Sequence, residues 1–189
     1  MVMPDSRSIG RAMNKPPVAM LRCCDVAACR SAKALKCPMR YALVICQVVV
    51  VIFLMLHDWV PLGKLNSMAG LRAVDSQNKR ILTTAISSLP FAAVLIPSIM
   101  FASVGYPDWL LWWLWGTYLA CTYGILRAWW IPYLGAADTD RAKRYSIRFR
   151  ETHSFLPVRN GIRPDSLHVG FHSLVLATLV ILAFLTFGH

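Results

Sequence analysis

The sequence contains few acidic residues: Asp and Glu together number 9, against 20 Lys and Arg, and the formal net charge is +11. It also lacks a P-loop, a dinucleotide-binding glycine fingerprint, a G-x-S-x-G motif, an H-E-x-x-H motif and any internal repeat. These absences argue against the common nucleotide-binding, serine-hydrolase and zinc-protease classes, and against a transporter built from inverted repeats.

The sequence is instead rich in apolar residues, which make up 57% of its 189 residues. In soluble domains, apolar residues make up about half of the chain or less. A chain that is both apolar and basic is typical of membrane proteins, in which apolar segments lie in lipid and basic loops face an anionic leaflet. The basic residues flank apolar runs and form no nucleic-acid-binding motif, so we expect no nucleic-acid partner. The expected partners are membrane lipids or another membrane protein.

Four apolar runs predict transmembrane helices at about 40–58, 81–104, 109–134 and 167–188. With its flanks, each run can cross a hydrocarbon core of about 30 Å. We therefore predict an all-α, polytopic membrane protein with a four-helix membrane domain at 39–189. In the third run, tryptophans gather at both ends, as in aromatic belts. Arg127 lies one turn inside the second belt, where it is a lipid anchor or a candidate catalytic residue.

Lys and Arg are concentrated in loops 1 (57–80) and 3 (135–168), whereas loop 2 (105–108) has none. The positive-inside rule places loops 1 and 3 in the cytoplasm and both termini outside. The segments "HDWVPLGKLN" and "LRAWWIPYL" resemble those of small bacterial inner-membrane proteins. The resemblance implies a bacterial cytoplasmic membrane but no activity and no residue roles.

Both basic loops contain segments with helical spacing. "DTDRAKRYSIRFRETH" (138–153) predicts a basic amphipathic helix that Asp138 or Thr139 caps, and "PLGKLNSMAGLRAV" in loop 1 has a similar pattern. Such helices beside a membrane usually lie in its interface. We expect both to form a solvated or lipid-contacting collar.

The N-terminal segment 1–38 is basic, contains cysteines and has no clear periodicity. Its charge opposes translocation to the outside. Three interpretations are open: an extension upstream of a true start at Met39, a disordered cytoplasmic tail, or a signal sequence without a recognisable cleavage site. We favour the first.

Titratable side chains gather where the predicted helices end on the cytoplasmic side. Asp165 or Ser166 is expected to cap the last helix. The candidate metal ligands are His57, His153, His168 and His172. A group of four histidines can bind Zn or Fe, or can serve as axial ligands of haem. Without a metal, the candidate catalytic groups are His57, Asp58, His153, Arg127 and Asp165.

A turn-rich segment, "FLPVRNGIRPDS", precedes the last helix, and Asn160-Gly161 is typical of a tight turn. Arg159, Arg163 and Asn160 are candidates for binding a lipid headgroup or another anion. A structural network of interfacial hydrogen bonds is the competing interpretation of all these polar groups.

We expect a small accessory or structural membrane protein that binds lipid or another membrane protein. The alternative is a membrane enzyme or redox subunit with a histidine and carboxylate site at its cytoplasmic face.

Overall fold

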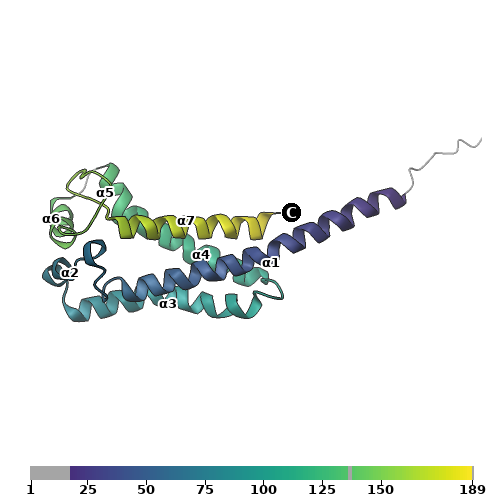
Figure 1. Cartoon of the computed structure of the whole chain (residues 1–189), viewed down its shortest axis with the longest axis horizontal. Helices are drawn as coiled ribbons and strands as arrows, with labels where there is room; N and C mark the ends of the chain where they lie inside the picture. Colours follow the sequence, from purple (N-terminus) through teal and green to yellow (C-terminus); the bar gives the residue numbers. More distant parts are fainter. Residues whose placement is uncertain (1–17, 136–137, 189) are drawn as a thin grey trace, which may run out of the picture.

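The computed structural model describes the backbone of residues 18–135 and 138–188, and side chains from residue 36 onward within these ranges. Every element named in these ranges is helical, and the only β-type pairing described is an isolated bridge between Arg159 and Ile162. The predicted all-α class is therefore confirmed. The long helices lie side by side along one axis (Figure 1).

The long helical runs of the bundle are α1 (Val18–Leu56), α3 (Gln77–Phe101), α4 (Asp108–Ile125), which continues through the π-helix η2 (Leu126–Trp130) and α5 (Ile131–Leu134), and α7 (Ser166–Phe187). α1 begins well before the predicted residue 40. The expectation for residues 1–17 lies outside the described residues.

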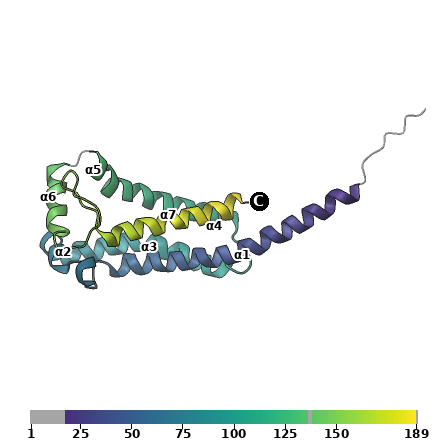
Figure 2. The same cartoon turned by 45° about the horizontal axis from the view of Figure 1, so that its top comes forward.

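Short helices occupy the two basic loops. They are η1 (Gly63–Leu65) and α2 (Met68–Val74) in loop 1, and α6 (Thr139–Arg148) in loop 3. Figures 1 and 2 show α2, α5 and α6 together at one end of the bundle. The position of α2 and α6 in a membrane interface stays a prediction.

Three described helical segments are long and apolar enough to cross a membrane: Lys36–Leu56, Gln77–Phe101 and Ser166–Phe187. The chain therefore has the character of a multi-pass membrane protein. The predicted span at 109–134 is not among them. Its α4 segment contains many Trp and Tyr, which hydropathy scales rate below aliphatic residues.

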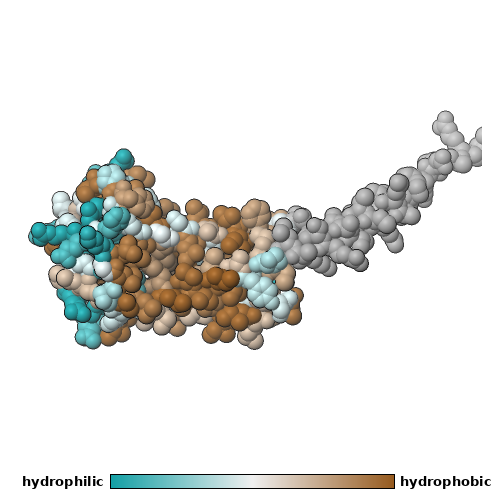
Figure 3. Space-filling view, viewed as in Figure 1, coloured by the Kyte–Doolittle hydropathy of each residue, from teal (hydrophilic) through white to brown (hydrophobic). Residues whose placement is uncertain are grey.

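The surface along the bundle is apolar, and hydrophilic side chains gather at the end formed by α2 and α6 (Figure 3). Large side chains such as Ile45, Leu89 and Phe184 are exposed on α1, α3 and α7. In water this arrangement would leave a large apolar surface unpaired, whereas in a bilayer it contacts lipid.

The core forms where α1 packs against α3 and α7, and α4 packs against α3 and α7. Each helix contributes fully buried side chains, among them Leu43, Val94, Leu114 and Leu182. These helices are apolar around most of their circumference, so no sharp polar–apolar boundary marks the inward face.

Two aspartates begin helices at the polar end. The Asp138 side chain accepts a hydrogen bond from the Arg141 backbone N–H, and the Asp165 side chain accepts one from the His168 N–H. Each satisfies an N–H that the first helical turn cannot pair, as predicted for α6 and α7.

The predicted turn at Asn160-Gly161 is also present. Asn160 and Gly161 have φ angles of 51° and 72°, and Arg159 and Ile162 exchange backbone hydrogen bonds of 2.9 and 2.8 Å. Positive φ at both central residues is typical of a type I′ turn, which Asn-Gly favours. The turn directs the fully buried Ile162 into a small aromatic cluster with Trp129 and Phe149.

Candidate functional site

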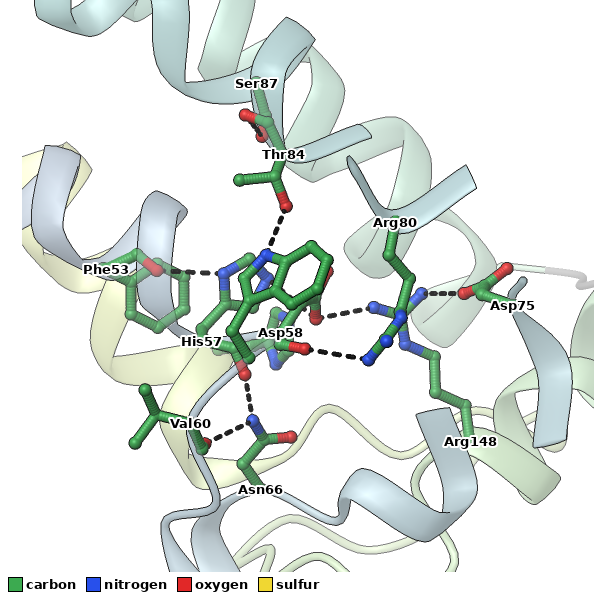
Figure 4. Close-up of polar contacts among 12 residues, drawn as sticks. Phe53, His57, Asp58, Val60, Asn66, Asp75, Arg80, Thr84, Ser87 and Arg148 are labelled. Atoms are coloured by element: carbon green, nitrogen blue, oxygen red, sulfur yellow. Dashed lines mark hydrogen bonds and ion pairs between the residues drawn. The ribbon is translucent and has the colours of Figure 1, made fainter. Parts of the chain in front are cut away.

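The polar end of the bundle is held together by a buried ion-pair network of Asp58, Asp75 and Arg148. Arg148 Nη2 lies 3.0 Å from an Asp58 carboxylate oxygen, and Nη1 lies 2.9 Å from one of Asp75 (Figure 4). Asp58 follows α1, Asp75 ends α2, and Arg148 is the last residue of α6. The network therefore connects three elements that are distant in sequence.

Both carboxylates of this network are almost inaccessible: Asp58 is 5% exposed and Asp75 8%. Lys79 Nζ adds a second cation 2.5 Å from Asp75. Since buried charges are costly without partners, the three side chains depend on one another.

The structure brings the rings of His57, His168 and His172 together. The ring centroids of His57 and His168 are 5.7 Å apart, and those of His168 and His172 are 6.4 Å apart. Phe53 stacks on His57 at 4.6 Å, and Trp129 lies 4.7 Å from His168. The result is a column of aromatic and imidazole rings between α1, η2 and α7.

Each of two histidines in the column has a carboxylate partner. His57 Nε2 lies 3.3 Å from Asp58, and its Nδ1 lies 2.9 Å from the Phe53 carbonyl oxygen. His168 Nδ1 lies 2.8 Å from the Asp165 carboxylate. His153, in contrast, is exposed and contacts Ser166 Oγ at 2.8 Å. Within the described residues, no group of three or more His, Cys, Asp or Glu side chains is placed to hold a metal ion.

The environment shifts the pKa values of His57 and Asp165 from their ordinary values. Burial lowers the pKa of His57, outweighing the opposite effect of Asp58, and the charges of His168 and Arg148 lower it further. Burial alone would raise the pKa of Asp165. The hydrogen bonds and the charge of His168 outweigh burial and hold that pKa below its usual value.

The His57 shift predicts lower stability in acid. The folded protein binds a proton at His57 less readily than the unfolded chain, in which the pKa of this histidine has its ordinary value of 6.5. The contribution of neutral His57 to the free energy of unfolding is therefore complete above pH 6.5. It is lost as the pH falls below this value. We expect the thermal unfolding midpoint in mild detergent to decrease between about pH 7.5 and 5, with a smaller decrease in a His57→Gln variant.

The exposed His153 provides the control for this prediction. A His153→Gln variant should keep the full pH dependence of the parent protein. An equally steep decrease in the His57→Gln variant would contradict the assignment to His57.

A cationic pocket of about 410 Å³ lies beside the ion-pair network, between α3, α4 with η2, and α6. Its cationic lining residues are Lys79, Arg127, Arg141, Arg144 and Arg148, and the only carboxylate that lines it is Asp75. Arg148 and Lys79 already pair with that carboxylate. The pocket therefore keeps an excess of positive charge.

The π-helix η2 positions α6 as one wall of this cationic pocket. Pro132 has no N–H to donate to the preceding turn. The Arg127 carbonyl oxygen accepts a hydrogen bond from Arg141 Nη1 at 2.8 Å, and that of Ala128 accepts one from Tyr145 Oη at 2.9 Å. Burial raises the pKa of Tyr145, which keeps its hydroxyl available as a donor.

The anion-binding candidates predicted from the sequence do not line this pocket. Arg163 Nη2 donates to the carbonyl oxygens of Phe149 and Thr152 at 3.2 and 2.9 Å. Asn160 donates to backbone carbonyls at the end of α5, and the Arg159 guanidinium lies 5.7 Å from the Tyr133 ring centroid.

Of the predicted site residues, Arg127 lines the cationic pocket. Arg141, Arg144 and Arg148, which were expected in a solvated or lipid-contacting collar, also line this pocket, and their spacing along α6 was a signal for a shared face. Comparison of the chain with protein-family models, curated proteins and solved structures gave no match.

Proposed function

We propose that the chain is a four-span protein of a bacterial cytoplasmic membrane, of the accessory or structural class, which binds anionic lipid headgroups in its cationic pocket. The fourth span would be the continuous helical run Asp108–Leu134, about 40 Å long at the usual helical rise. Trp109 and Trp112 near its start and Trp130 near its end support this assignment, because tryptophans anchor spans at both interfaces.

The distribution of charge supports the proposed orientation. Loops 1 and 3 contain the basic residues that the positive-inside rule assigns to the cytoplasm. The start of α1 and the end of α7 lie away from α2 and α6 (Figure 1), in agreement with both termini outside. The cationic pocket would then open at the level of the inner-leaflet headgroups, where anionic lipids are available.

The observation that carries the headgroup proposal is the excess of arginine in an open pocket. Arg127 and Arg144 are exposed and line the pocket, and the pocket's carboxylate is already paired. Guanidinium groups bind phosphate oxygens through strong, charge-assisted hydrogen bonds. A phosphodiester headgroup supplies the missing negative charge.

Arg144→Gln tests this proposal against the neighbouring Lys143→Gln, which removes an exposed cation of the same helix that does not line the pocket. The protein is placed in nanodiscs of phosphatidylcholine with a minor fraction of phosphatidylglycerol, and retained lipids are counted by native mass spectrometry. Loss of one hydrogen bond to a charged group costs about 1.5–3 kcal/mol. We expect phosphatidylglycerol retention to weaken about tenfold in Arg144→Gln and little in Lys143→Gln.

Equal effects of the two variants would assign the affinity to general surface charge, and no effect of Arg144→Gln would contradict binding in the pocket. The alternative function, a membrane enzyme or redox subunit that uses the histidines, stays a prediction. Elemental analysis for Zn and Fe and a visible spectrum of the purified protein test it.

A further inference from the structure

A second hollow, of about 470 Å³, shares Asp75 with the cationic pocket. It is bounded by the residues after α1, by α2 and by the first turns of α3. The residues that line it are Trp59, Met68, Arg72, Asp75, Ser76, Gln77 and Arg80. Arg72 and Arg80 are its cations, and its carboxylate, Asp75, is paired with Arg148 and Lys79.

Arg80 is the unusual residue of this second hollow. It is only 9% exposed, and its Nε is buried without a hydrogen-bond partner. Its Nη1 donates to the Asp58 carbonyl oxygen at 3.3 Å, and its guanidinium lies 4.7 Å from the Trp59 ring centroid. The nearby carboxylates of Asp58 and Asp75 pair with Arg148 instead (Figure 4).

Among the ion pairs of the described residues, none joins the buried Arg80 to a carboxylate. A buried cation is costly unless an anion and hydrogen bonds compensate for its lost hydration. A carbonyl oxygen and an aromatic face compensate only in part. The unpaired Nε leaves one donor of this guanidinium without an acceptor, so the compensation for its burial is incomplete.

The start of α3 lines the same hollow. Ser76 is the N-cap, and its hydroxyl and carbonyl accept from the N–H groups of Lys79 and Arg80. The N–H groups of Gln77 and Asn78 belong to the first turn, which has no intrahelical partners for them. No acidic residue occupies this turn. The positive end of the helix dipole therefore lies in the same hollow as Arg72 and Arg80.

We propose that this second hollow binds a phosphate group, with Arg80 as the buried anchor, Arg72 as the exposed partner and the α3 N-terminus as a source of backbone donors. Guanidinium and first-turn N–H groups are the donors that proteins use for phosphate. The phosphate can belong to a lipid headgroup or to a soluble phosphate ester. The site goes beyond the proposed function, because Arg127, Arg141 and Arg144 do not line it.

The test uses the full-length protein in phosphatidylcholine nanodiscs, in two arms. In one, inorganic phosphate is titrated by calorimetry; in the other, phosphatidate is added to the nanodiscs and its retention is measured by native mass spectrometry. Arg72→Gln is the principal variant because Arg72 is exposed, so that its loss should leave folding intact. Arg80→Lys retains the charge but removes the fork of donors. Lys143→Gln is the control.

We expect binding in at least one arm, weakened about tenfold or more by Arg72→Gln and by Arg80→Lys, and unchanged by Lys143→Gln. Binding of inorganic phosphate would indicate a soluble phosphate ester as the natural ligand, and binding of phosphatidate alone would indicate a lipid headgroup. Absence of binding in both arms, or binding that both arginine variants leave unchanged, would overturn the proposal.

Discussion

Replacing Arg148 by methionine is expected to lower the free energy of unfolding by about 3 kcal/mol. Arg148 provides partners for Asp58 and Asp75, and without it both carboxylates stay buried near the end of the bundle. Removal of one partner from a buried ion pair typically costs about 3–5 kcal/mol. We place the effect at the lower end, because the Arg148 side chain is 26% exposed and His57 and Lys79 remain beside the two aspartates.

Urea unfolding in mild detergent, followed by tryptophan fluorescence, measures this change. Lys143→Met, an exposed position of the same helix, is the control and should change stability by less than about 0.5 kcal/mol. The triple variant Asp58→Asn/Asp75→Asn/Arg148→Met also removes the two unpaired carboxylates. It should recover part of the lost free energy of unfolding. An Arg148→Met protein as stable as the control would show that the network does not hold α6 to the bundle.

The second large effect is expected at Gly70, where α2 crosses α6. A Cβ atom at this position would overlap the Arg148 carbonyl oxygen and lie 2.9 Å from that of Ile147. Both are backbone atoms, so the clash is relieved only if α2 moves away from α6. Gly70→Ala is therefore expected to destabilise the protein by about 2 kcal/mol, within the usual cost of overpacking.

Gly116→Ala is the matched control for Gly70→Ala, because a Cβ on Gly116 in α4 meets no atom within 4 Å. It should leave stability unchanged or raise it by up to about 1 kcal/mol, since alanine favours the helix interior. Thermal unfolding of both variants in the same detergent makes the comparison. Equal stability of the two would contradict the close α2–α6 contact.

Features set by local sequence were predictable. The caps Asp138 and Asp165 and the Asn160-Gly161 turn each depend on residues within four positions, and the structure has all three. The helical class follows in the same way from the length of the apolar runs. The spans at 40–58, 81–104 and 167–188 have described counterparts among the three long apolar helices, whereas the aromatic run 109–134 is helical but is not among them.

The site depends on contacts that local patterns do not encode. Arg148 pairs with residues 73 and 90 positions away, and these contacts attach α6 to the end of the bundle. The role of Arg163 was also hidden. The sequence showed a cation in a loop. The carbonyl oxygens of Phe149 and Thr152, which accept hydrogen bonds from Arg163, become apparent only in the folded loop.

The π-helix η2 was not predicted, although Pro132 indicated an irregularity in this helical run. Proline within a helical run removes an N–H, but the sequence does not reveal whether the helix ends, kinks or widens. Here α6 supplies hydrogen-bond donors to carbonyl oxygens of η2, through the side chains of Arg141 and Tyr145. That docking forms the cationic pocket, so the pocket could not be predicted without it.

The most direct test of headgroup binding is an experimental structure in nanodiscs that contain phosphatidylglycerol. We expect phosphate density in the cationic pocket, within about 3 Å of the guanidinium groups of Arg127 or Arg144. Loss of this density in phosphatidylcholine alone would establish that the pocket selects anionic lipid. A pocket filled only by water or by protein side chains, with the headgroups ordered elsewhere, would contradict the proposed function.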